Sequence, residues 1–114
     1  VNIAEEISML ASAAKTRKLK LPDLKGSSFT ISSLGAIGGK FFTPIINPPE
    51  VGILGVSKTF SKVVVKNEGF ESREFLPLSL SYDHRVINGV YAAQFITQLG
   101  AALGDAVLME AKFQ

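Results

Sequence analysis

The chain has 114 residues, of which 46% are hydrophobic and 19% are charged, and its formal net charge is +2. This composition excludes a disordered segment and is typical of one folded domain or part of one. The net charge is too small to indicate a nucleic-acid surface, and no apolar run approaches the ~18 residues needed to cross a bilayer. We therefore expect neither a nucleic-acid partner nor a membrane partner.

Residues 2 to about 18 predict an amphipathic helix, because apolar residues recur there at helical spacing. Five of the twelve basic residues lie close together around its end: Lys15, Arg17, Lys18, Lys20 and Lys25. They form either a solvated helix end or a steering patch for a phosphate-bearing ligand, and the net charge does not decide between the two.

Residues 28–34 predict a strand, with Phe29 and Ile31 on one side and Thr30 and Ser32 on the other. The glycine-rich loop that follows lacks the Lys-Ser/Thr pair of a phosphate-binding loop. Its glycine spacing does not fit a dinucleotide fingerprint either, so both kinds of nucleotide loop are rejected.

Three prolines between residues 44 and 49 predict an extended connection. It leads into residues 51–56, which are nearly all apolar, as expected of a strand buried on both faces. Residues 62–66 predict another strand, and the Asn-Glu-Gly sequence at 67–69 predicts a hairpin turn after it.

After Phe75, the residues Leu76, Leu78, Leu80 and Tyr82 alternate with Pro77, Ser79, Ser81 and Asp83, which predicts a strand. If the alternation continues, His84 points inward on the same face as Tyr82. An apolar stripe then predicts a helix, with Asn88 as its N-cap and Gly104 at its end. The mixture of strands and helices indicates an α/β or α+β fold.

Histidine occurs once, as His84, and cysteine is absent. Disulfides and catalysis by a thiolate of this chain are therefore excluded. A metal site of the usual imidazole or thiolate type would lack ligands, so we expect no metal. If the protein moves protons through an imidazole near neutral pH, His84 must be that group.

Three segments carry a resemblance to a known family, the acyltransferases of 2-oxo acid dehydrogenase complexes. The family's signature, Asp-His-Arg-x-x-Asp-Gly, resembles residues 83–89, Asp-His-Arg-Val-Ile-Asn-Gly. Its second motif is similar to residues 29–35, Phe-Thr-Ile-Ser-Ser-Leu-Gly, and its central strand region is similar to residues 42–57. The matches follow the family's order and spacing and together cover residues 26 to about 110.

The resemblance implies a chloramphenicol acetyltransferase-like fold, a two-layer α/β (α+β) arrangement of a mixed sheet with flanking helices. It also implies that residues 1–114 are the carboxyl-terminal portion of a catalytic domain. The amino-terminal half and the lipoyl and subunit-binding modules are then absent, and Val1 in place of Met agrees with a chain cut from a longer one. We expect such a piece to be inactive alone and to leave apolar surface uncovered.

The resemblance further implies a reaction, the transfer of an acyl group between dihydrolipoamide and coenzyme A. Coenzyme A is then a substrate, and the lipoyl group is carried on a separate domain. A thiol with a pKa near ~8.5 is mostly protonated at neutral pH and needs a base, the role implied for His84. Ser32, with Ser33 as its competitor, would donate a hydrogen bond to the oxyanion. Asn88 stands where most members carry Asp and would support the site through neutral hydrogen bonds.

The family also implies a homotrimer within a larger core assembly, in which Ser32 and His84 meet across a subunit interface. The expected partners are the lipoyl domain and the other enzymes of the complex. The expected location is the bacterial cytoplasm or, in a eukaryote, the mitochondrial matrix. The stretch from Leu78 to Gly89 looks most like the pyruvate (acetyl) branch.

Three alternatives stay open. A chloramphenicol acetyltransferase-like O-acyltransferase would share the histidine chemistry, but such proteins usually carry a second His where this chain has Asp83. A serine hydrolase would need a Gly-x-Ser-x-Gly elbow, which the sequence lacks. A non-catalytic assembly scaffold would use Val107, Leu108 and Met109 as a contact between trimers.

Overall fold

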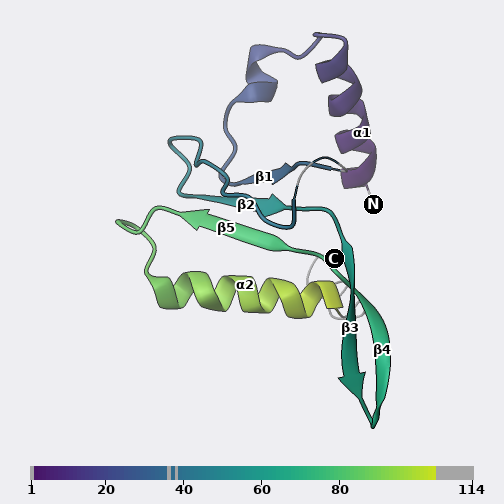
Figure 1. The fold of residues 1–114 in the computed structure, drawn as a ribbon. Helices are drawn as coiled ribbons and strands as arrows, with labels where there is room; N and C mark the ends of the chain where they lie inside the picture. The colour runs from purple at the N-terminus through teal and green to yellow at the C-terminus, as the bar shows by residue number, and fades with distance from the viewer. Residues whose placement is uncertain (1, 36, 38, 105–114) are drawn as a thin grey trace.

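The computed structural model describes residues 2–35, 37 and 39–104 (Figure 1). The predicted trimer contact at residues 107–109 lies outside this part of the chain. The helices are α1 (Asn2–Lys15), the short 3₁₀ helix η1 (Leu21–Leu24) and α2 (Gly89–Gly104). The strands are β1 (Thr30–Ser33), β2 (Gly52–Val56), β3 (Phe60–Lys66), β4 (Gly69–Phe75) and β5 (Leu78–Tyr82). Among the described helices, none is long and apolar enough to span a bilayer.

The body of the fold is a mixed three-stranded sheet in the order β1-β2-β5. β2 lies in the centre, parallel to β1 and antiparallel to β5. Its residues Ile53 and Leu54 are 5% and 6% exposed, so the predicted strand buried on both faces is confirmed. The mixed sheet and its helices also confirm the predicted α/β class.

The two faces of this sheet are covered differently. Leu80 and Tyr82 face α2, and between them lies an apolar cavity of about 130 Å³. Phe29 lies on the same side, its ring centroid 5.8 Å from that of Phe95 in α2. On the other face the ring of Phe42 lies directly over Gly55, where an added Cβ would come within 2.8 Å of it. The faces predicted for the β1 strand are therefore confirmed.

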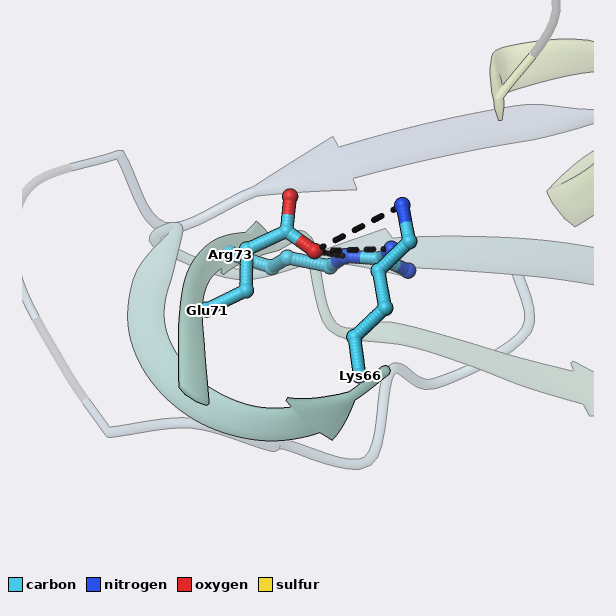
Figure 2. Close-up of polar contacts among 3 residues, drawn as sticks. All are labelled: Lys66, Glu71 and Arg73. Atoms are coloured by element: carbon cyan, nitrogen blue, oxygen red, sulfur yellow. Dashed lines mark hydrogen bonds and ion pairs between the residues drawn. The ribbon is translucent and has the colours of Figure 1, made fainter. Parts of the chain in front are cut away.

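Strands β3 and β4 form a hairpin that extends away from the sheet (Figure 1). Asn67 and Glu68 both have positive φ, 47° and 66°, as the tight turn requires, so the predicted hairpin turn is confirmed. Figure 2 shows one carboxylate, Glu71, between two cations: Arg73 Nη2 lies 3.1 Å and Lys66 Nζ 3.7 Å from its Oε2. These side chains are about half exposed, so the ion pairs contribute little stability.

Helix α1 presents its apolar stripe to solvent. The predicted helix is confirmed but ends earlier than residue 18, at Lys15, and Arg17 has φ 56°. Ile3 and Ile7 are 69% and 62% exposed, and none of the described strands or helices packs against α1. An amphipathic helix gains most of its stability from packing its apolar face. α1 therefore presents apolar surface suited to contact with further protein.

Candidate functional site

His84 lies in the turn between β5 and α2. The prediction that it points inward is wrong, because β5 ends at Tyr82 and the strand alternation does not reach His84. The imidazole is exposed but stays on the Tyr82 side, with the two ring centroids 5.6 Å apart. An exposed imidazole is accessible from solvent without any rearrangement of the core.

The turn that carries His84 is fixed through Asp83. The Asp83 amide donates to the carbonyl of Val51 (2.8 Å), which ties the turn to the start of β2. The Asp83 carboxylate accepts hydrogen bonds from the Arg85 backbone N (3.0 Å), Nε (3.0 Å) and Nη2 (2.8 Å). These bonds, first of all that from the Arg85 side chain, hold the pKa of Asp83 below its ordinary value. The carboxylate therefore stays ionised and keeps the turn in shape.

Helix α2 starts directly after this turn. Asn88 Oδ1 accepts a hydrogen bond from the Tyr91 amide (2.8 Å), so the predicted N-cap is confirmed. Gly89 follows, and a Cβ added there would lie 3.7 Å from Tyr82 Oη and 4.0 Å from His84 Nε2. A larger side chain at position 89 would therefore fill the space beside His84 Nε2.

Ser32 and Ser33 occupy different environments on β1. Ser32 is half-buried and lies next to Gly55 of β2, on the face covered by Phe42. Ser33 is exposed, and its Oγ accepts a hydrogen bond from the Gly35 amide (3.1 Å). The Ser33 hydroxyl thus helps form the turn after β1, whereas Ser32 faces the other side.

Within one chain, Ser32 and His84 do not come together. The register places Ser32 of β1 beside Gly55 of β2, and Gly55 beside Ser79 of β5. Ser32 and Ser79 are therefore at the same level of the sheet, two strand spacings apart. His84 lies in the turn beyond Tyr82, and Tyr82 follows Ser79 by three residues, roughly 10 Å along the strand; two strand spacings add roughly 10 Å across the sheet. The two residues also lie towards opposite faces of the sheet.

A hollow of about 410 Å³ adjoins His84. Its walls come from the turn before β2 and from the turn after β5: Ile46, Pro48, Pro49, Glu50, Val51, Tyr82, Asp83, His84 and Arg85. Among the described residues, no group of three or more His, Cys, Asp or Glu side chains is placed to hold a metal ion. The lining combines apolar side chains (Ile46, Pro48, Pro49 and Val51) with the polar side chains Glu50, Tyr82, Asp83, His84 and Arg85.

Sequence reasoning missed Glu50, a carboxylate that is only 8% exposed. It accepts hydrogen bonds from Thr30 Oγ1 (2.6 Å), Ser27 Oγ (2.8 Å) and Asn47 Nδ2 (3.4 Å). The bond from Thr30, and then that from Ser27, lower the pKa of Glu50 from its ordinary value. The signal in the sequence was a charged residue immediately before a strand predicted to be buried on both faces.

Comparisons with known proteins agree with this arrangement. A model of the family described as 2-oxoacid dehydrogenases acyltransferase (catalytic domain) matches residues 1–111. The chain is 53% identical over 103 residues to the dihydrolipoyllysine-residue acetyltransferase component of the pyruvate dehydrogenase complex of Buchnera aphidicola. That match covers 90% of this chain and 26% of the relative. The corresponding component of Pseudomonas aeruginosa is 53% identical over 105 residues, 92% of this chain and 19% of the relative.

Two solved structures are similar throughout the described fold. One is the dihydrolipoamide acetyltransferase of Azotobacter vinelandii, with a TM-score of 0.88 and 50% identity over 95% of this chain and 45% of that one. That work concerns the catalytic role of a serine, a histidine 52 residues after it and an asparagine four residues further on. The other is the cubic core of a pyruvate dehydrogenase multienzyme complex, with a TM-score of 0.86 and 52% identity over 93% of this chain and 44% of that one.

The chain spans about a quarter or less of the length of these curated relatives and just under half of the two solved chains. The family match nevertheless extends over nearly all of its residues, and its fold is similar to those of the two solved relatives. The chain belongs to the 2-oxoacid dehydrogenase acyltransferase family and lies within its catalytic domain.

Proposed function

We propose that this chain forms the carboxyl-terminal portion of a dihydrolipoamide acyltransferase catalytic domain and carries its base, His84. One observation carries the proposal. Ser32 and His84 are 52 positions apart (84 − 32), and Asn88 follows His84 by four, the spacing of the three residues studied in the Azotobacter vinelandii enzyme. The same spacing favours Ser32 over Ser33.

The chemistry follows from the properties of the side chains. His84 accepts the proton of the coenzyme A thiol, and the thiolate attacks the carbonyl carbon of the acyl thioester on dihydrolipoamide. The carbonyl oxygen becomes an oxyanion, to which the Ser32 hydroxyl donates a hydrogen bond. When the intermediate collapses, the bond to the lipoyl sulfur breaks and His84 returns the proton to that sulfur. Acyl-coenzyme A and dihydrolipoamide are the products, and His84 is neutral again.

A second copy of the chain supplies the missing half of each site. Ser32 of one copy does not reach His84 of the same copy, since two strand spacings (roughly 10 Å) and the roughly 10 Å from Ser79 to the end of β5 separate them. A cyclic trimer repeats one heterologous interface three times, so each interface would pair His84 from one copy with Ser32 from the next. Three such sites then form in each trimer.

Asn88 supports the site while it caps α2. Its Oδ1 is engaged with the Tyr91 amide, which leaves the Nδ2 group as the part able to donate elsewhere. An amide is neutral, so it orients its partner without the charge that Asp would bring.

The names of the relatives favour acetyl as the acyl group and the pyruvate dehydrogenase complex as the assembly. The lipoyl domain would deliver the acyl group, and the other enzymes of the complex would be partners. Such a complex belongs in the bacterial cytoplasm or the mitochondrial matrix. The cubic core of the solved relative also favours a scaffolding role, and the catalytic and scaffolding roles are separable by experiment.

The test measures acetyl transfer from acetyl-coenzyme A to dihydrolipoamide by the complete catalytic domain that contains this chain. His84→Ala should reduce the rate by about 10²–10⁴ with the assembly intact, since that is the usual contribution of a general base. Ser32→Ala should reduce it by about 10²–10³, and Ser33→Ala serves as the matched control with little effect. Full activity of His84→Ala would refute the assignment of the base. A wild-type domain that assembles correctly but transfers no acetyl group would refute the catalytic function and favour a non-catalytic assembly scaffold.

A further inference from the structure

Glu50 is an unusual residue for the place it occupies. It is 92% buried, and in the described part of the chain its hydrogen-bond partners are two hydroxyls and one amide rather than a cation. Burial of a carboxylate is unfavourable unless its oxygens are hydrogen-bonded. Its two oxygens are bonded separately: Oε1 to Thr30 and Oε2 to Ser27 and Asn47.

The first link runs from Glu50 to the strand that carries Ser32. Thr30, the donor at 2.6 Å, is the first residue of β1 and lies two residues before Ser32 on the same face. β1 has four residues and, within the described part of the chain, is the edge strand of the sheet, paired with β2 alone. A short edge strand has few hydrogen bonds to hold its position, so the bond to Glu50 fixes the start of β1.

The second link runs from Glu50 to the turn that carries His84. The Glu50 amide donates to the carbonyl of Asn47 (3.0 Å), which closes the turn before β2. The next residue, Val51, accepts the Asp83 amide at 2.8 Å, and Glu50 and His84 line the same hollow. A displacement of this turn would therefore be passed to Asp83 and then to His84.

We infer that Glu50 is a positioning residue that holds Ser32 and His84 of one chain in a fixed relation, because its carboxylate joins Thr30 and Ser27 to the turn before β2 that binds Asp83. The inference rests on the proposed function, in which Ser32 and His84 of one chain belong to two different sites. One Glu50 then supports two neighbouring sites of the trimer. The role of Glu50 depends on the geometry of its hydrogen bonds and not on its charge. A hydroxyl both donates and accepts, so the amide of a glutamine at position 50 can bond to the hydroxyls of Thr30 and Ser27.

The test compares Glu50→Ala, Glu50→Gln and Thr30→Val in the complete catalytic domain, with kcat expressed per assembled trimer. Glu50→Ala should lower kcat about 10- to 100-fold, the range expected when catalytic groups shift by about 1 Å. Glu50→Gln should stay within about threefold of the wild type. The double variant Glu50→Ala/Thr30→Val should be no slower than Glu50→Ala alone, since both changes remove the same hydrogen bond.

Glu74→Ala is the matched control, because Glu74 also accepts from a serine, Ser61, but lies exposed on the hairpin. It should leave kcat unchanged. A Glu50→Ala domain with wild-type kcat would overturn the inference. Equal losses in Glu50→Gln and Glu50→Ala would overturn it as well, since they would assign the effect to charge.

Amide hydrogen exchange gives a second readout that needs no activity. Exchange of the β1 amides and of the Asp83 amide should accelerate together in Glu50→Ala and stay slow in Glu50→Gln. Unchanged exchange in Glu50→Ala would contradict the coupling. If the wild-type domain transfers no acyl group, the proposed function fails, while the exchange measurement still decides whether Glu50 joins the two segments.

Discussion

Replacement of Asn88 by alanine removes the cap of α2 at the point where the helix meets His84. Asn88 Oδ1 accepts from the Tyr91 amide at 2.8 Å, and alanine would leave that amide without its side-chain partner. Loss of an N-cap costs about 1 kcal/mol, within a range of about 0.5–2 kcal/mol. For a domain of about 150–250 residues, that corresponds to a fall in Tm of roughly 2–4 °C. Asn88→Asp keeps an oxygen at the cap and places a negative charge at the helix N-terminus, so it should retain stability.

Thermal unfolding of the complete catalytic domain, followed by circular dichroism, measures this difference. Gln98→Ala, an exposed change on the same helix, is the control and should lie within about 0.5 kcal/mol of the wild type. Acyl transfer by Asn88→Ala should fall further than the loss of folded protein explains. The reason is that Gly89, the next residue, lies beside His84 Nε2. An Asn88→Ala domain as stable as the wild type, or an Asn88→Asp domain as unstable as Asn88→Ala, would refute the capping argument.

Three further predictions concern the space beside His84, the hydrophobic core, and the free energy of unfolding at acid pH. Gly89→Val should lower kcat at least tenfold, because the added side chain fills the space 4.0 Å from His84 Nε2. Gly100→Val, in open space on the same helix, should leave kcat within about threefold of the wild type. Equal kcat values for the two variants would contradict this prediction. Leu54→Ala should destabilise the domain by about 2–5 kcal/mol in denaturant unfolding, and a cost below about 1 kcal/mol would show that β2 is not the core strand. The hydrogen bond from Thr30 holds the pKa of Glu50 below 4.5 in the folded chain. As the pH falls, the Glu50 carboxylate is therefore protonated at a higher pH in the unfolded chain than in the folded one. The free energy of unfolding should therefore fall as the pH drops below about 4.5, and less steeply in Glu50→Gln; parallel curves would contradict the shift.

Much of the fold could be predicted because the relevant signals are local. The apolar run of β2, the Asn-Glu-Gly turn and the cap at Asn88 each depend on a few adjacent residues, and the structure confirms all three. The boundaries were less accurate, since the helix ends at Lys15 and β3 begins at Phe60. Such ends depend on tertiary contacts that the pattern does not contain.

The sequence predicts candidate residues for the site but not their geometry. The solitary histidine and the family signature identified His84, yet the alternation wrongly placed it inside the protein because β5 ends two residues earlier. Glu50 was missed because its partners Ser27 and Thr30 lie 23 and 20 positions away in the sequence, and only the folded sheet brings them together. Periodicity shows which face a residue occupies, whereas the register shows that Ser32 and His84 of one chain lie apart.

Complementation between two inactive variants tests the shared site most directly. Ser32→Ala keeps His84, and His84→Ala keeps Ser32, so an interface between the two variants can contain one intact pair. With equal co-expression and random assembly of trimers, about a quarter of the interfaces should pair intact His84 with intact Ser32 in the required orientation. The mixed assembly should therefore recover about a quarter of the wild-type acetyl transfer, while each variant alone stays inactive. A mixed assembly as inactive as its parents, with both variants shown to be present in the same trimers, would contradict a site built between copies.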